Sequence, residues 1–191
     1  ANMIFVGKML DLLSGYTLVG GLAFLAVFSF HGAAFLLLRL SHSPLEERVS
    51  RMGRRVGLVA IAAFAAYLAL TAVRTEIFSM TVAPLLLVGA AVVFIAGYAF
   101  FFAGRPAPAF ALTSAAIVLT TVGVFAALFP NLMISKMDPA YSLTIYNAAS
   151  SPYTLTVMTI AAACLVPVVL IYQGWTYWVF RKRVTLHDME H

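Results

Sequence analysis

Long apolar runs, interrupted by short charged or turn-forming clusters, dominate the pattern along this chain. Between Asp11 and Arg39 lie 27 uncharged residues, and 28 uncharged residues separate Glu76 from Arg105. A helix needs about 20 apolar residues to cross the ~30 Å hydrocarbon core of a bilayer. Strands are a poor alternative, because apolar and polar positions do not alternate and an open sheet edge cannot lie in lipid. The pattern predicts five membrane-spanning helices, at residues 16–40, 44–73, 82–103, 109–129 and 152–180.

Two of these helices carry recognisable start signals. Ser43, Pro44 and Glu46 form a capping box with proline at the first helical position. Ser151 followed by Pro152 predicts the same kind of start for the last helix. These signals leave residues 130–151 as a loop and residues 181–191 as a tail.

Composition decides which class of protein these runs indicate. Apolar residues make up 63% of the 191 positions and charged residues only 10%. Soluble globular chains have about 45–50% and about 25%, so we expect an all-α integral membrane protein. Cys164 is the single cysteine, which excludes an intrachain disulfide and a thiolate zinc cluster within this chain. No basic stretch is interleaved with exposed polar sequence, so we do not expect nucleic acid as a partner.

The basic residues indicate how the five helices are oriented. With the amino terminus outside, nine Lys or Arg residues fall on the inner side and three on the outer side. Cytoplasmic loops carry the excess of positive charge, so we expect a cytoplasmic carboxy terminus and an outer loop at 130–151. The inner set is Arg39, Arg48, Arg51, Arg54, Arg55, Arg105, Arg181, Lys182 and Arg183, and the outer set is Lys8, Arg74 and Lys136.

His31 is the exceptional ionisable residue, because it falls in the middle of a predicted span. Such a residue is a functional candidate by default, and an imidazole could ligate haem iron or hydrogen-bond a quinone. The alternative is a neutral ring bonded to a neighbouring helix, with small residues at 32–34 allowing close packing. We favour this alternative, because the spans contain no second histidine. No triad, paired carboxylates or metal-ligand spacing is present, so we expect neither a catalytic nor a metal site.

The predicted outer loop is the other informative stretch. Residues 142–151 mix apolar side chains with short hydrogen-bonding ones, which suits a loop that folds onto a bundle or covers a partner. An ordinary connecting loop explains this composition equally well. Tryptophans near the end of the last helix fit an interfacial aromatic belt. Our candidates for partner contact or for capping the loop are Tyr146, Asn147, Ser150, Ser151, Trp175 and Trp178.

Several motifs resemble subunit II of the cytochrome bd quinol oxidases. The resemblance covers nearly the whole chain and is most specific between Phe129 and Arg183, whereas residues 44–129 match mainly in hydropathy. The motifs are Phe30-His31-Gly32-Ala33-Ala34, Phe129-Pro130-Asn131, the run from Ser142 to Ser151, and Trp175-Thr176-Tyr177-Trp178.

The resemblance implies a fold beyond what the residues alone show. In that family subunit II has nine membrane helices, arranged as two four-helix bundles plus a peripheral helix. Five helices therefore imply the carboxy-terminal half, with one four-helix bundle and one peripheral helix in a single domain over residues 1–191. The family's proton-path carboxylates belong to the other half, so no position here inherits that role.

The resemblance also implies a function. The chain would be a structural, non-haem-ligating part of a bd-type quinol:dioxygen oxidoreductase of the aerobic respiratory chain, in a bacterial or archaeal plasma membrane. Haem b and haem d would be bound by the partner, subunit I, and quinol would be the substrate of the complex. A small single-helix subunit and membrane lipid are the further partners expected.

Two other functions compete with this one. Half of a small-molecule transporter would use polar or broken helices at mid-membrane, and His31 and Pro167 are features of that kind. A self-sufficient membrane cytochrome would need a second axial ligand, which one of the eight methionines could supply. Uptake assays would identify the transporter, and haem stoichiometry would identify the cytochrome.

Overall fold

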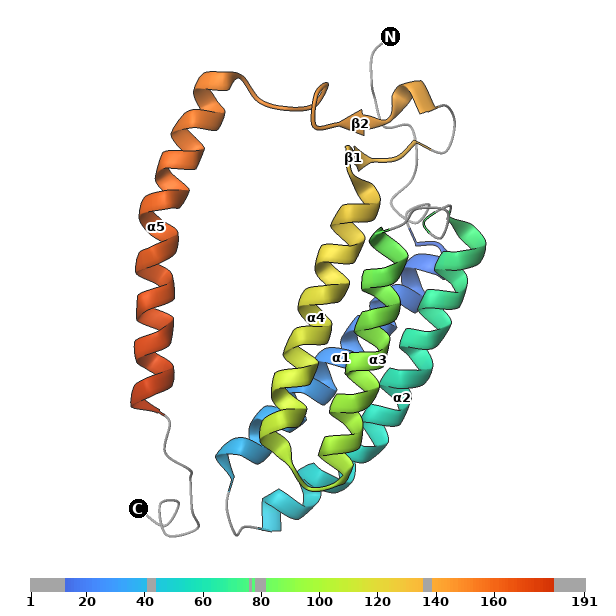
Figure 1. The fold of residues 1–191 in the computed structure, drawn as a ribbon, viewed down its shortest axis with the longest axis vertical. Coiled ribbons are helices and arrows are strands. Elements are labelled where there is room, and N and C mark those ends of the chain that lie inside the picture. The colour runs from blue at the N-terminus through green and yellow to red at the C-terminus, as the bar shows by residue number, and fades with distance from the viewer. Residues whose placement is uncertain (1–12, 41–43, 76, 78–81, 136–138, 181–191) are drawn as a thin grey trace. The chain divides into compact units, whose positions relative to one another are not determined.

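The computed structural model describes residues 13–40, 44–75, 77, 82–135 and 139–180. Its five long helices occupy the segments expected from the apolar runs (Figure 1). All five are long and apolar enough to cross a membrane, so the chain is an all-α, multi-pass membrane protein. The helices are α1 (Gly15–Arg39), α2 (Pro44–Arg74), α3 (Val82–Phe102), α4 (Pro106–Leu128) and α5 (Pro152–Val179).

Side-chain caps account for two helix starts. Ser14 and Thr17 form a capping box at α1, in which the Ser14 hydroxyl accepts from the Thr17 N–H at 3.2 Å. At α5 the Ser151 hydroxyl accepts from the Thr154 N–H at 3.3 Å, with Pro152 in the first turn. The start signal at α5 is the one that the sequence predicts, whereas the capping box predicted at Ser43 lies outside the described residues.

A tight turn joins α3 to α4. Gly104 has a φ of +72°, a left-handed conformation that L side chains rarely adopt. In this turn the Arg105 N–H donates to the Phe100 carbonyl, and the Gly104 N–H donates to the Phe101 carbonyl. α4 then begins at Pro106 instead of the expected residue 109. The reason is that prolines in a first helical turn lack only N–H groups that have no intrahelical partner.

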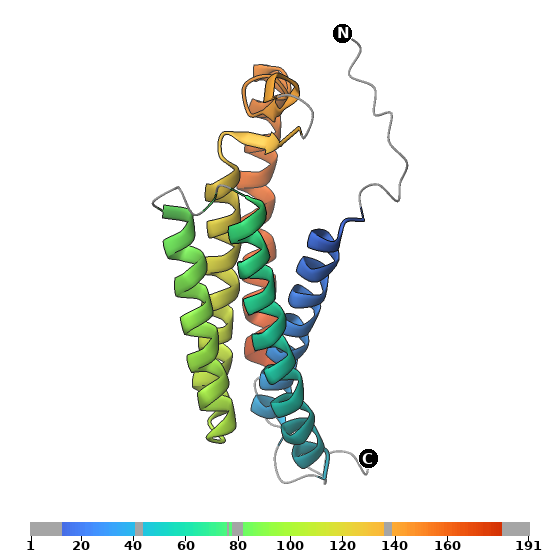
Figure 2. The same cartoon turned by 90° about the vertical axis from the view of Figure 1, so that its right-hand side faces the viewer.

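The described chain divides into two compact units, with the boundary between Ala127 and Leu128 at the end of α4. The first unit contains α1 to α4, which pack together as a four-helix bundle (Figure 2). The second unit contains a loop followed by α5. The loop holds β1 (Asn131–Met133), the 3-10 helix η3 (Pro139–Tyr141) and β2 (Leu143–Thr144), and the two strands pair antiparallel. Strands of two or three residues are too short to show an alternating pattern in the sequence.

In the core of the bundle, small residues of one helix pack opposite aromatic rings of another helix. Phe30 of α1 is fully buried, and its ring centroid lies 4.9 Å from that of Phe101 and 5.5 Å from that of Phe94, both on α3. The buried positions of α4 are all small, with a spacing of three or four residues. They are Ala109, Thr113, Ala116, Thr120, Gly123 and Ala127.

Gly57 on α2 is required for this packing. A Cβ atom at this position would lie 2.5 Å from Cδ2 of Tyr98 and 2.9 Å from Cε2 of Phe30. Both rings therefore pack directly on the backbone of α2. Gly53, one turn earlier, leaves the same kind of space for the ring of Phe101.

Outside this core, large apolar side chains are exposed along all five helices. A contiguous apolar surface of this extent is not stable in water, whereas it is the expected exterior of a bundle in lipid. Buried hydroxyls avoid a desolvation cost by bonding within their own helix. Thr120, for example, donates to the Ala116 carbonyl at 2.8 Å.

We expect Gly57→Ala to lower the free energy of unfolding by about 1–3 kcal/mol, because the methyl group forces the buried ring of Phe30 and the half-buried ring of Tyr98 to move. Far-UV circular dichroism of the detergent-solubilised protein measures this as a lower thermal midpoint. Gly89→Ala on α3 is the matched control, since a Cβ atom there meets nothing within 4 Å. Equal midpoints for the two variants would contradict the packing described here.

Candidate functional site

The imidazole of His31 forms a hydrogen bond between α1 and α4. Its Nδ1 lies 2.8 Å from Oγ1 of Thr113, a residue that is fully buried. The Thr113 hydroxyl also lies 3.0 Å from the carbonyl oxygens of Ala109 and Phe110 on its own helix. The Thr113 hydroxyl is therefore within hydrogen-bonding distance of the His31 ring and of carbonyls on its own helix, and it links α1 to α4 inside the bundle.

A ring contact fixes the orientation of the same imidazole. The ring centroids of His31 and Phe110 lie 4.6 Å apart with an angle of 20° between the planes, so the two rings stack. The bond to Thr113 and the stack on Phe110 together hold the side chain against α4. Nε2 is the ring nitrogen that takes no part in the contact with Thr113.

Thr113 is a residue that the sequence analysis missed. It belongs to the buried series of small residues on α4. The recurrence of small residues every three or four positions was the signal that the sequence offered for it. Nothing in the sequence indicates which helix packs beside His31, so the partner could not be identified before the fold.

The described part of the chain has few other side chains that could bind a metal or transfer a proton. Within residues 13–40, 44–75, 77, 82–135 and 139–180, no three His, Cys, Asp or Glu residues come together to form a metal site. The carboxylates within the five helices are Glu46 and Glu47, in the first turn of α2. The Cys164 thiol is exposed on α5. An acid–base relay across the described spans would therefore have no carboxylate at mid-membrane.

Asn147 organises the loop between β2 and α5. Its side-chain oxygen accepts from the Thr144 N–H at 2.7 Å, and its side-chain nitrogen donates to the Ser142 carbonyl at 3.0 Å. Its backbone N–H donates to the Thr144 hydroxyl at 3.2 Å. A neighbouring bond, from the Ile145 N–H to the Pro130 carbonyl, joins the two arms of the loop. These bonds satisfy backbone groups locally, which is the kind of contact expected for Asn147.

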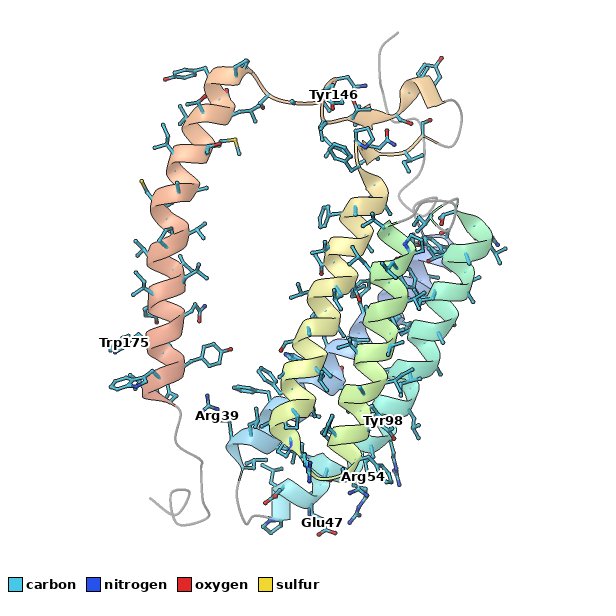
Figure 3. All side chains as sticks on the ribbon, in the orientation of Figure 1. Arg39, Glu47, Arg54, Tyr98, Tyr146 and Trp175 are labelled. Atoms are coloured by element: carbon cyan, nitrogen blue, oxygen red, sulfur yellow. The ribbon has the colours of Figure 1, made fainter. Side chains whose placement is uncertain are left out.

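The other loop and helix candidates have different environments. Ser151 caps α5, whereas Ser150 is exposed and forms no hydrogen bond with the described residues. Tyr146 is 77% exposed, so its ring does not anchor the loop from within (Figure 3). Trp175 and Trp178 are also exposed, near the end of α5. The three aromatic side chains are therefore accessible to groups outside the described residues.

Comparison with known proteins gives a family match along most of the chain. Residues 1–180 match the family described as cytochrome bd terminal oxidase subunit II. Cytochrome bd ubiquinol oxidase subunit 2 of Bacillus subtilis is 33% identical over 189 residues, which cover 97% of this chain and 55% of the relative. Cytochrome bd-I ubiquinol oxidase subunit 2 of Escherichia coli K12 is 46% identical over 79 residues, covering 41% and 20%. The chain thus spans about half the length of the Bacillus relative.

We expect Asn147→Ala to weaken the loop by about 1–2 kcal/mol, because the variant loses both side-chain hydrogen bonds. Limited proteolysis should then cut within residues 130–151 about 5- to 30-fold faster than in the unaltered protein. Ser150→Ala is the matched control, because its hydroxyl forms no hydrogen bond with the part of the chain that the structure describes. Rapid cleavage of the unaltered loop, at the rate of the variant, would show that the Asn147 bonds do not order it.

Proposed function

Since the chain belongs to the cytochrome bd terminal oxidase subunit II family, we propose that it is part of a bd-type quinol:dioxygen oxidoreductase of an aerobic respiratory chain. Its role in that complex is structural. It stabilises the haem-bearing partner and ligates no haem itself.

The contacts of His31 carry this proposal. Its Nδ1 is hydrogen-bonded to the Thr113 hydroxyl and its ring is stacked on Phe110, so the side chain has a packing role that joins two helices. The described spans offer no second imidazole with which His31 could ligate one haem iron, and no carboxylate at mid-membrane for a proton relay. Other parts of the complex then bind the haems and transfer the protons.

In this role the chain assembles with other subunits of the oxidase. Subunit I binds haem b and haem d, and the complex oxidises quinol. A small single-helix subunit is a further partner of the assembly. The exposed side chains of Tyr146, Trp175 and Trp178 are candidates for partner contact, because aromatic rings bury large areas at protein interfaces at a low entropic cost.

The chain lies in a bacterial or archaeal plasma membrane, with the carboxy terminus in the cytoplasm. The described arginines support this orientation. Five of them lie at the end of α1 or the start of α2, and one lies in the turn between α3 and α4, which all meet at one end of the bundle (Figure 1). Arg74 lies at the opposite end of α2. The resulting charge asymmetry is the one that membrane insertion favours.

Purification of the assembled complex through a tag on this chain tests the structural role. We expect haem absorption bands and a larger haem-bearing subunit in the purified material. His31→Ala should leave the bands and the haem-to-protein ratio unchanged, while lowering the free energy of unfolding by about 0.6–1.7 kcal/mol through loss of the Thr113 bond.

Thr113→Val is the control for that experiment, because it removes the same bond without touching the imidazole. It should reproduce the part of the stability loss that comes from the bond, because the stack of His31 on Phe110 remains. Selective loss of one haem band in His31→Ala, with assembly intact and with normal bands in Thr113→Val, would assign His31 to the haem and reject the structural role.

Reporter fusions test the orientation separately. A reporter that is active only in the cytoplasm should give signal when fused after His191, because the positive charges hold the α2 start and the α3–α4 turn inside. A reporter active only outside the plasma membrane should give no signal at that position. The reverse result would contradict the proposed orientation.

A further inference from the structure

A surface at one end of the first unit combines exposed arginines with exposed apolar side chains. Arg54 lies on α2 and Arg105 lies in the α3–α4 turn, and both are exposed. Neither arginine has a carboxylate partner among the described residues. Glu47, on the same helix, is instead paired with Arg51 at 2.9 Å. We call this surface the Arg54 patch, formed by Arg54, Leu58, Ile95, Tyr98, Phe102 and Arg105.

Contacts with α3 hold Arg54 in place. Its guanidinium carbon lies 4.8 Å from the ring centroid of Phe102, which is a cation–π contact. The Tyr98 hydroxyl donates to the Arg54 carbonyl at 3.3 Å, so that ring lies beside the same turn of α2 (Figure 3). The planar charge of Arg54 is therefore oriented in advance, which reduces the side-chain entropy lost when an anion binds.

The backbone places the second charge at the same end of the bundle as the first. Phe102 precedes the Gly104 turn, in which the Arg105 N–H is bonded to the Phe100 carbonyl. Arg105 therefore follows, by three residues, the ring on which Arg54 lies. Each guanidinium group carries five N–H donors in a planar arrangement that suits phosphate oxygens.

The rest of the patch is apolar and extends away from the arginines along the helices. Leu58 is one turn beyond Arg54 on α2, and Ile95 is two turns before Phe102 on α3, so each shares a helix face with its neighbour at the charged end. Leu58, Ile95 and Phe102 are all exposed. The patch therefore changes from cationic to apolar over two or three helical turns.

We propose that the Arg54 patch binds an anionic phospholipid. The phosphate is held by Arg54 and Arg105, and an acyl chain lies along Leu58, Ile95 and Phe102. Charge complementarity with two unpaired arginines selects an anionic headgroup, and the adjoining apolar face selects a molecule with a long hydrocarbon chain. This inference is independent of the proposed function, because it uses only the bundle and its position in a membrane.

Titration with phosphatidylglycerol, followed by native mass spectrometry, tests the proposal on the protein extracted from its membrane and delipidated. A basic residue near an anionic surface contributes about a fivefold gain in affinity. Arg54→Gln and Arg105→Gln should each lower the affinity about fivefold, and the double variant about 25-fold. Arg74→Gln, at the opposite end of α2, is the charge-matched control and should leave the affinity unchanged.

A photoreactive phosphatidylglycerol provides a test that needs no variant. On the unaltered protein it should label peptides that contain Leu58 or Phe102.

Equal affinity for phosphatidylcholine, or equal affinity of the Arg54→Gln and Arg74→Gln variants for phosphatidylglycerol, would overturn the proposal. Competition by millimolar inorganic phosphate that abolishes labelling would assign the arginines to a free anion instead. Labelling confined to other regions, with a neighbouring polypeptide cross-linked at Phe102, would assign the patch to a protein partner.

Discussion

The fully buried ring of Phe30 packs against aromatic rings of α3, and it reaches them because α2 has no side chain at Gly57. Helices in lipid gain no hydrophobic free energy by associating, so close van der Waals contact has to stabilise the bundle. The same contact fixes the rotation of α1. His31 is the next residue along the helix, about 100° around its axis, and is thereby turned toward α4.

Hydrogen bonds follow a common pattern once the helices are packed. Buried threonines on α2 and α4 donate to carbonyls of their own helix, so that none of these hydroxyls carries an unsatisfied donor. Each hydroxyl oxygen can then accept a bond from α1. The His31 Nδ1 lies 2.8 Å from the Thr113 hydroxyl, and the Tyr16 hydroxyl lies 3.1 Å from the Thr71 hydroxyl. Two links of this kind tie α1 to α4 and to α2 in a medium without water to compete for them.

The exterior of the helices differs in polarity and pairing from the interior of the bundle. Polar groups inside the bundle are paired, whereas apolar side chains on the outside are exposed over the length of the spans. Such a surface is suited to lipid and to other membrane helices. In the two proposals, the exposed aromatic side chains of α5 contact a protein partner and the Arg54 patch of the bundle contacts lipid.

The sequence by itself determined that the described residues form five long apolar helices, because apolar runs are a local feature, whereas it placed the start of α4 three residues too late. It also offered Asn147 as a candidate for capping the loop or contacting a partner, because an amide side chain can bond to backbone groups a few residues away. Contacts between distant residues could not be read in the same way. Thr113 lies 82 positions from His31, and only the packing of α1 against α4 brings the two together. The tertiary structure alone therefore decided which residue the imidazole of His31 bonds to, because that partner comes from another helix.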